Sequence, residues 1–287
     1  MRILITGGNG QLGNEWVRYL NKQGVEFIAL PSSDLDITDH EDVRRVLSNL
    51  KPDRIINCAA YTNVDQAEDE QEKAFAVNEG GVRNLGDYCA SNGIKLIHFS
   101  TDYVFPGTEE DYKKYPEGYT EDHPTNPINT YGESKLAGEK AIERSGCDYL
   151  IIRVSWLCGK FGNNFVKTML RLASERDQLS VVHDQYGCPT FTQNVVENGW
   201  VLLENNISGT YHLTSKGKIT WYDFAKEIFT QSKTDVKLEP VSSTEFPVKA
   251  KRPSFSLLST RKIANIPDIS LIDWKKGLTN LLAELKS

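Results

Sequence analysis

The chain has 287 residues and a formal net charge of −6 at pH 7. Hydrophobic residues make up 39% and charged residues 25%, which are globular proportions and exclude a disordered, collagen-like or coiled-coil chain. The acidic balance argues against a nucleic-acid partner or an anionic membrane surface, because both require a basic face. It does not exclude a phosphorylated ligand, since backbone dipoles can bind phosphate on an acidic protein.

Neither a membrane span nor a disulfide framework is indicated. No apolar run approaches the ~18 residues of a membrane-spanning helix, and the apolar stretch after Met1 is too short for a secretory signal. The five cysteines include no CxxC pair, and the five histidines form no HxxxH or HExxH pair. We therefore expect reduced thiols, no structural zinc site and a cytoplasmic protein without a membrane partner.

Short apolar runs alternate with amphipathic segments in the first half of the chain. Strands buried on both faces are expected at 2–6, 26–30, 54–57, 95–100 and 149–154. Helices are expected at 12–22, 41–50, 72–91 and 131–144. Thr38 with Glu41 forms a capping-box pattern for the second helix, and Gly24 and Gly93 stand where helices commonly end. This alternation predicts a Rossmann-type α/β fold with a doubly wound parallel sheet.

The alternation loosens in the second half. Residues 106–127 are polar, rich in Pro and Gly and without a clear period, which predicts a long functional loop. Helical patterns then cover 165–175, 193–203, 221–229 and 274–285, with strand-like runs at 180–183 and 210–213. We interpret residues 1–158 as a dinucleotide-binding domain that carries the catalytic residues. Residues 159–287 are interpreted as a smaller α/β substrate-binding lobe, interleaved with the first domain.

A glycine-rich TGxxGxxG element runs from Thr6 to Gly13, directly after the first expected strand and into the first helix. Gly7 permits a tight turn, Gly10 allows close approach of a pyrophosphate, and Gly13 allows the helix to pack closely on the strand. A pyrophosphate would then lie at the positive helix N-terminus. The element predicts dinucleotide binding.

The tip of the second strand bears on which dinucleotide is bound. NAD-binding folds usually place an acidic residue there, which bonds the ribose 2′-hydroxyl. Here Leu30 is followed by Pro31, Ser32 and Ser33, and the first acid is Asp34. The missing acid and the two serine hydroxyls favour NADP. NADH remains the alternative, because no arginine stands there to bind the 2′-phosphate.

Two YxxxK motifs place a phenol and an ammonium on one helix face, Tyr131 with Lys135 and Tyr222 with Lys226. A tyrosine has a pKa near 10, and a neighbouring cation lowers it toward the range useful for proton transfer. Tyr131 lies between two strands of the cofactor-binding half, whereas Tyr222 lies in an apolar stretch typical of a core helix. We therefore assign catalysis to Tyr131 and a structural role to Tyr222.

A hydroxyl beside the tyrosine is supplied by Thr101, at the end of the fourth strand, where open α/β sheets bind ligands. With Thr101, Tyr131 and Lys135 the chain resembles the extended short-chain dehydrogenase/reductase family, and residues 57–60 match that family's cofactor turn. Within it, the chain is similar to the dTDP-4-dehydrorhamnose reductase family. The similar stretches, in family order, are 10–13, 100–107, 129–139, 162–165, 184–190 and 252–253.

The resemblance implies catalysis by Thr101, Tyr131 and Lys135. Together with the glycine loop it implies a cofactor site of Gly7, Gly10, Gln11, Leu12, Gly13, Asp36, Ile37, Ala60, Tyr61, Thr62, Tyr131 and Lys135. It implies substrate contacts from Thr101, Asp102, Tyr131 and Trp156, with the indole as a flat apolar wall. Arg252 is expected either to bind the substrate diphosphate or to form a surface salt bridge.

The implied reaction is NADPH-dependent reduction of the C4 keto group of dTDP-4-dehydro-L-rhamnose to dTDP-L-rhamnose, for surface polysaccharide synthesis. A dehydratase of this fold would carry glutamate where Tyr103 stands, and an epimerase would favour an acid at the second strand tip. Another nucleotide-sugar epimerase or reductase of the family stays an alternative. A non-catalytic cofactor-binding regulatory subunit is the alternative from a different class.

Some members of the resembled family dimerise through a magnesium site built from glutamates. Glu15 matches one such position, but Gln193 stands where another glutamate is expected. Magnesium therefore stays open, as does the choice between a monomer and a homodimer.

Overall fold

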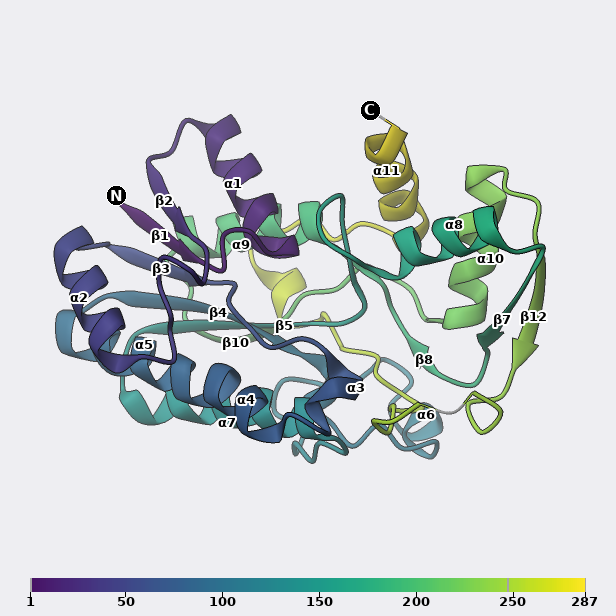
Figure 1. Ribbon diagram of the computed structural model, residues 1–287, viewed down its shortest axis with the longest axis horizontal. Helices are drawn as coiled ribbons and strands as arrows, with labels where there is room; N and C mark the ends of the chain where they lie inside the picture. Colours follow the sequence, from purple (N-terminus) through teal and green to yellow (C-terminus); the bar gives the residue numbers. More distant parts are fainter. Residues whose placement is uncertain (1, 247, 287) are drawn as a thin grey trace.

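The computed structural model describes residues 2–246 and 248–286 and contains a six-stranded, all-parallel central sheet (Figure 1). The strand order is β10-β5-β4-β3-β1-β2. Its strands are β1 (Ile3–Thr6), β2 (Phe27–Leu30), β3 (Arg54–Asn57), β4 (Lys95–Thr101), β5 (Tyr149–Val154) and β10 (Gly209–His212). The Rossmann-type sheet predicted from the alternation is confirmed. The order reverses between β1 and β3, and such a switch point is where doubly wound sheets bind ligands.

Helices cover both faces of this sheet, so its strands are apolar nearly throughout. One face carries α1 (Gln11–Gln23) and α9 (Thr192–Glu204), and the other carries α2 (His40–Leu50), α4 (Gln71–Phe75), α5 (Val82–Asn92) and α7 (Thr130–Ser145) (Figure 1). Ile3 and Ile5 of β1 belong to the hydrophobic cluster on the first face, whereas Leu4 belongs to the cluster on the second. Because successive side chains of a strand point to opposite faces of the sheet, this short strand contributes to two hydrophobic cores.

Two details of the helices differ from the expectations. The predicted capping box of Thr38 and Glu41 is wrong: Asp39 caps α2 and accepts hydrogen bonds from Glu41 N and Asp42 N. Thr38 instead donates its hydroxyl to Asp36 Oδ1 at 2.8 Å. The expected helix 72–91 is interrupted by a π-helical segment, η1 (Ala76–Gly81), between α4 and α5. The helix ends at Gly24 and Gly93 are confirmed, with φ of 67° and 64°.

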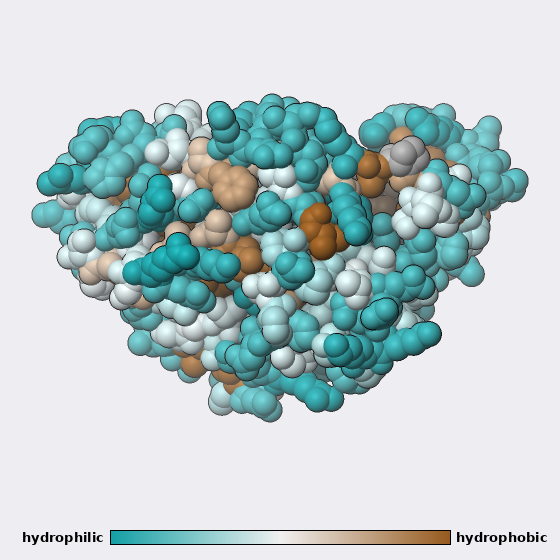
Figure 2. Space-filling model, turned by 90° about the horizontal axis from the view of Figure 1, so that it is seen from below, coloured by the Kyte–Doolittle hydropathy of each residue, from teal (hydrophilic) through white to brown (hydrophobic). Residues whose placement is uncertain are grey.

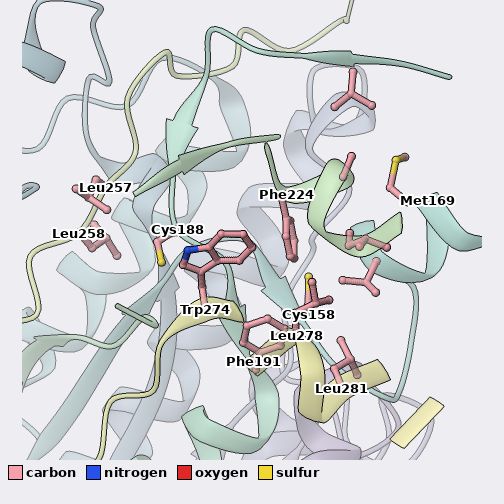
Figure 3. Packing of buried hydrophobic residues seen from close by; sticks show 14 of the residues in the cluster. Cys158, Met169, Cys188, Phe191, Phe224, Leu257, Leu258, Trp274, Leu278 and Leu281 are labelled. Atoms are coloured by element: carbon pink, nitrogen blue, oxygen red, sulfur yellow. The ribbon is translucent and has the colours of Figure 1, made fainter. Parts of the chain in front are cut away.

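The C-terminal part forms a second layered unit with its own core. It contains α8 (Phe165–Glu175), α10 (Trp221–Ser232), α11 (Trp274–Lys286) and the strands β6 (Leu157–Cys158), β7 (Gln178–Val182), β8 (Tyr186–Gly187), β9 (Thr190–Phe191), β11 (Ile219–Thr220) and β12 (Lys237–Val241). The short helix η3 (Ile263–Asn265) instead packs on the first face of the central sheet through Ile263. Figure 3 shows Trp274 packed among Phe224, Leu278 and Cys188 in this core. Strand β10 returns to the central sheet and pairs with β5 in parallel.

The segment 106–127, expected as a loop without structure, contains a short helix, α6 (Asp111–Lys114), and a fully buried side chain, Tyr119. Tyr119 stacks on Phe105 with ring centroids 4.5 Å apart, and its hydroxyl donates to Asp111 Oδ2 at 2.6 Å. Its backbone N–H donates to Leu257 O at 2.9 Å. This segment is therefore anchored to the C-terminal core. Two further short helices, α3 (Val64–Ala67) and η2 (Asp102–Val104), follow β3 and β4.

The surface seen in Figure 2 is mostly hydrophilic, with apolar side chains in small separate groups. The exposed large hydrophobic side chains among the described residues are Phe246 and Val248, which are 47% and 43% exposed. None of the helices that the structure describes has the length and apolar character needed to cross a membrane. All five cysteines are free thiols.

Candidate active site

A cavity of about 480 Å³ opens at the carboxyl edge of the central sheet, at its switch point. The ends of β1, β3, β4 and β5 meet here because the strands are parallel and in register. Of the predicted site residues, ten line the cavity: Gly10, Gln11, Leu12, Ala60, Thr62, Thr101, Asp102, Tyr131, Lys135 and Trp156. Phe165 and Trp221 of the C-terminal part line its other side.

The glycine loop follows β1 and forms one wall of the cavity. Gly7 has φ of 63°, and a Cβ there would lie 2.7 Å from Ala59 N. A Cβ at Gly13 would lie 2.3 Å from Gly7 O, so only glycine allows α1 to pack this closely on the turn. Gly10 caps α1 without a side-chain hydrogen bond, which leaves the first-turn N–H groups for an anion. Gly7 and Gly13 thus shape the loop without lining the cavity.

Tyr131 lies in the first turn of α7, whose N-cap Asn129 accepts a hydrogen bond from Gly132 N at 2.8 Å. Burial and the nearby Asp102 carboxyl raise the pKa of Tyr131 to about 12, and a hydrogen bond with Thr101 opposes this rise. The phenol is therefore protonated in the free protein. It can donate a proton to an oxygen that develops negative charge in the cavity.

Asp102 lies beside Thr101 at the end of β4 and is 3% exposed. Thr101 Oγ1 donates to Asp102 Oδ1 at 2.9 Å, while Oδ2 is buried without a hydrogen-bond partner among the described residues. Burial raises the pKa of Asp102 to about 7, and the nearby hydroxyls of Ser256 and Thr101 counteract the rise. A buried carboxyl with an open oxygen can bind a sugar hydroxyl.

Lys135 lies one helical turn after Tyr131 and is 2% exposed. Its Nζ donates to Phe99 O at 2.7 Å and lies 3.2 Å from His98 Nε2. Burial lowers the pKa of Lys135 to about 8, and the charge of the nearby Glu139 carboxylate opposes this effect. The amine thus lies in the cavity wall, and near neutral pH its protonated form is only slightly more stable than its neutral form.

Trp156 follows β5 in a left-handed backbone conformation, with φ of 47°. Its indole stacks on that of Trp221, the first residue of α10, with centroids 3.5 Å apart and planes at 11°. A bulky residue in this conformation is strained and persists only where its surroundings hold it. The two indoles form a flat apolar wall between the two parts of the molecule.

Four predicted site residues lie away from the cavity. Asp36 is exposed and accepts hydrogen bonds from Thr38, and Ile37 is buried in the core beneath α5. Tyr61 donates its hydroxyl to Glu70 at 3.1 Å. Arg252 pairs with Asp65 at 2.8 Å, while its Nη1 is buried without a partner among the described residues. A second cavity that shares Phe165 and Trp221 with the first includes Arg252.

Three residues of the site were not singled out from the sequence. Asn78, on η1, donates to Ser134 Oγ at 2.9 Å and to Tyr61 O at 3.0 Å, and so links the segment after β3 to α7. Trp221 was visible only as an apolar neighbour of Tyr222, which packs against the C-terminal core. His98 lies within the apolar strand β4, and the pattern of that strand does not predict a role for it. The one sequence feature that could have indicated His98 is a polar side chain inside an otherwise apolar buried strand.

The residues at the expected magnesium position do not fit the ion. Arg18 pairs with Glu15 at 2.5 Å and with Glu284 at 2.7 Å, so a guanidinium already occupies the position between these carboxylates. Thr192 Oγ1 donates to the other Glu15 oxygen at 2.8 Å, and Gln193 bonds Glu197. Within residues 2–246 and 248–286, no three His, Cys, Asp or Glu side chains gather as a metal site.

Comparison with known proteins shows which family the chain resembles over its whole length. The family model described as the RmlD substrate binding domain matches residues 1–287. A dTDP-4-dehydrorhamnose reductase of Aggregatibacter actinomycetemcomitans is 40% identical, with 98% of each chain covered. A dTDP-4-keto-6-deoxy-D-glucose reductase of Streptomyces niveus is 39% identical over 90% of this chain and 88% of its own. The crystal structure of a Bacillus anthracis dTDP-4-dehydrorhamnose reductase in complex with NADP has a TM-score of 0.93, 41% identity and 99% coverage of both chains.

Proposed function

The chain belongs to the RmlD substrate binding domain family, and from this premise we propose that it is an NADPH-dependent dTDP-4-dehydrorhamnose reductase. It reduces the C4 keto group of dTDP-4-dehydro-L-rhamnose to dTDP-L-rhamnose, a donor for surface polysaccharide. The observation that carries this proposal is the cavity that brings Thr101, Tyr131 and Lys135 beside the glycine loop.

The bound nicotinamide supplies the hydride in this reaction. Tyr131 donates its phenolic proton to the C4 oxygen as negative charge develops there. Thr101 hydrogen-bonds the same oxygen, and Asp102 binds a neighbouring sugar hydroxyl through its open Oδ2. Lys135 holds the cofactor ribose, and in its charged form it lowers the pKa of the Tyr131 phenol.

The stacked indoles of Trp156 and Trp221 offer an apolar face to the deoxysugar. Arg252 binds the diphosphate when it exchanges its Asp65 partner for phosphate oxygens, because a guanidinium suits both anions. Its unpartnered Nη1, in the cavity adjoining the first, supports this role.

The cofactor is NADPH in preference to NADH. The strand β2 ends at Leu30, and Ser32 and Ser33 after it are exposed hydroxyls. The nearest carboxylate, Asp34, accepts a hydrogen bond from Ser33 Oγ at 3.0 Å. The N-terminal unit, 1–158, binds this cofactor, and the unit 159–287 binds most of the dTDP-sugar. The protein acts as a cytoplasmic monomer or homodimer.

A second candidate is the reduction of a different dTDP-4-keto sugar. The Streptomyces niveus relative, named for dTDP-4-keto-6-deoxy-D-glucose, is almost as similar to this chain as the rhamnose enzyme. The two substrates differ in the configuration of ring carbons that the indole wall would contact. Dehydration is disfavoured by Tyr103, which stands where a dehydratase carries glutamate and whose pKa burial raises further.

Stoichiometry tests the proposal. With dTDP-4-dehydro-L-rhamnose in excess, loss of NADPH absorbance should equal dTDP-L-rhamnose formed, mole for mole. With dTDP-glucose and NAD, no 4-keto product should form. Turnover of the 4-keto sugar without NADPH loss would overturn the assignment in favour of an epimerase. Faster reduction of dTDP-4-keto-6-deoxy-D-glucose would favour the second candidate.

A further inference from the structure

A chain of buried polar groups runs beneath the candidate active site, from β3 to Lys135. Asn57 is the last residue of β3, and His98 lies opposite it in the parallel register with β4. The Asn57 amide contacts His98 Nδ1 at 3.0 Å, and His98 Nε2 contacts Lys135 Nζ at 3.2 Å. Asn57, His98 and Lys135 are 1%, 0% and 2% exposed. Among the described residues, Lys135 is the one hydrogen-bond partner of His98 Nε2, so the position of each proton follows from the neighbouring donors and acceptors.

The backbone determines which way the Asn57 amide faces. Ala59 N lies 3.1 Å from the atom assigned as Asn57 Oδ1, and Thr6 Oγ1 lies 2.6 Å from the same atom. A backbone N–H can only donate, so this atom must be the carbonyl oxygen. The NH₂ group of Asn57 therefore faces His98. Since an amide nitrogen can only donate, His98 Nδ1 is an acceptor and carries no proton.

A neutral imidazole has one proton, so His98 must carry it on Nε2, the nitrogen that faces Lys135. The ring is neutral because burial and the neighbouring Lys135 lower the pKa of His98 well below its ordinary value. A histidine N–H thus points at an ammonium, which has three N–H donors and no lone pair. Two donors face each other as long as Lys135 is charged.

We propose that His98 is a positioning residue that opposes the charge of Lys135, because its Nε2–H can form a hydrogen bond only with the neutral amine. The other groups that face Lys135 supply little compensation. Glu139, one turn along α7, is held by Arg153 in a bidentate pair at 2.9 and 2.6 Å. Cys58 follows β3 and is a neutral thiol whose pKa burial raises, and the Tyr131 phenol is protonated.

In the free protein the ammonium therefore has the carbonyl of Phe99 as its acceptor, at 2.7 Å. A bound ligand hydroxyl would add an acceptor and favour the charged form, so ligand binding at Lys135 is coupled to proton uptake. Burial also lowers the pKa of Lys135, to about 8, so the amine titrates within an accessible pH range. The coupling rests on the proposed function, since it takes the cofactor ribose as the ligand, whereas the position of the His98 proton does not.

Nitrogen-15 NMR of the free, full-length protein tests the proton position directly. Protonated and bare ring nitrogens have separate shifts, and the variant His98→Asn assigns the signal by its loss. We expect a neutral His98 with the proton on Nε2 throughout pH 6–8. A proton on Nδ1, or an imidazolium, would overturn the inference, and the shifts that decide it are those of the wild-type protein.

A ¹³Cε-lysine titration of the same free protein tests the effect on Lys135. Asparagine can still accept from Asn57 but has no group at the Nε2 position, so His98→Asn should tighten proton binding by Lys135 about tenfold. His212→Asn is the matched control, since His212 is also buried in a sheet strand, and it should leave the titration unchanged. An unchanged titration in His98→Asn would mean that His98 only fills space. Neither measurement depends on the sugar substrate, so failure of the reductase assignment would be seen separately.

Discussion

Two fully buried histidines, His98 on β4 and His212 on β10, lie on either side of β5, and each contacts a cation. Their proton arrangements are opposite. His212 Nδ1 lies 3.1 Å from the backbone oxygen of Tyr119 and must donate to it, so its Nε2 is bare and accepts from Arg153 Nη1 at 3.4 Å. His98 Nδ1 accepts from Asn57, so its Nε2–H faces Lys135. Burial lowers the pKa of both rings.

The difference shows that a buried histidine can either stabilise or oppose the charge of a neighbouring cation, depending on which ring nitrogen carries the proton. Arg153 is surrounded by acceptors: the bare His212 nitrogen and both oxygens of Glu139. Lys135 has one backbone carbonyl and a histidine donor. We infer that the Arg153 region stabilises the fold and that the Lys135 region keeps a proton available for exchange.

The largest effect is expected from the phenol beside Lys135. Tyr131→Phe should lower kcat by at least about a hundredfold, the usual contribution of a general acid, with little change in cofactor affinity. Tyr222→Phe is the matched control, with the same deletion in the second YxxxK motif, and should leave kcat nearly intact. Steady-state kinetics of both variants measure this. Equal losses would mean that the catalytic tyrosine was chosen wrongly.

The second effect distinguishes the two cations by their contribution to stability. Arg153→Met leaves Glu139 buried and uncompensated, and should cost about 3–5 kcal/mol of unfolding free energy. Lys135→Met removes a buried charge without a carboxylate of its own, and should change the unfolding free energy by less than about 1 kcal/mol while abolishing reduction. Denaturant unfolding of both variants gives the comparison. A Lys135→Met variant as unstable as Arg153→Met would remove the distinction drawn between the two regions.

Much of this arrangement followed from the sequence because it depends on local pattern. Apolar runs between amphipathic segments predicted the sheet. Thr101 ends β4 and Tyr131 lies in the first turn of α7, and both line the same cavity. The features that the sequence did not predict depend on contacts between segments far apart in the chain. The π-helix that carries Asn78, the stacking of Trp156 on Trp221, and the His98 proton each require a partner far along the chain. The failed capping box has a local cause, since Asp39 competes with Thr38 for the same helix end.

The third effect concerns the pH dependence of stability. The pKa of His212 is lowered to about 3, so between that value and its unfolded value near 6.5 the unfolded chain binds one more proton. Stability should therefore fall as pH drops below about 6.5, by up to about 1.4 kcal/mol per pH unit for this group. His212→Asn should reduce this slope between pH 5 and 6.5, as measured by urea unfolding. A slope unchanged in the variant would show that other groups cause the loss at acid pH.

The smallest effect is expected in cofactor binding, where the region around Lys135 should respond to pH and the region around Arg153 should not. The pKa of Lys135 is about 8 in the free protein, and the ammonium donates a stronger hydrogen bond to a ribose hydroxyl than the neutral amine does. If binding requires that form, the Kd for NADPH should rise about fourfold between pH 7 and 8.5, since the protonated fraction falls in that proportion. Fluorescence titration measures this at constant ionic strength.

In Lys135→Met the affinity should be weaker and independent of pH over this interval, because the titrating amine is gone. In His98→Asn the rise should move to higher pH, because the lysine then retains its proton more tightly. A wild-type Kd that is constant from pH 7 to 8.5 would show that Lys135 remains charged throughout, as Arg153 does, and the contrast between the two buried cations would then be confined to the free energy of unfolding.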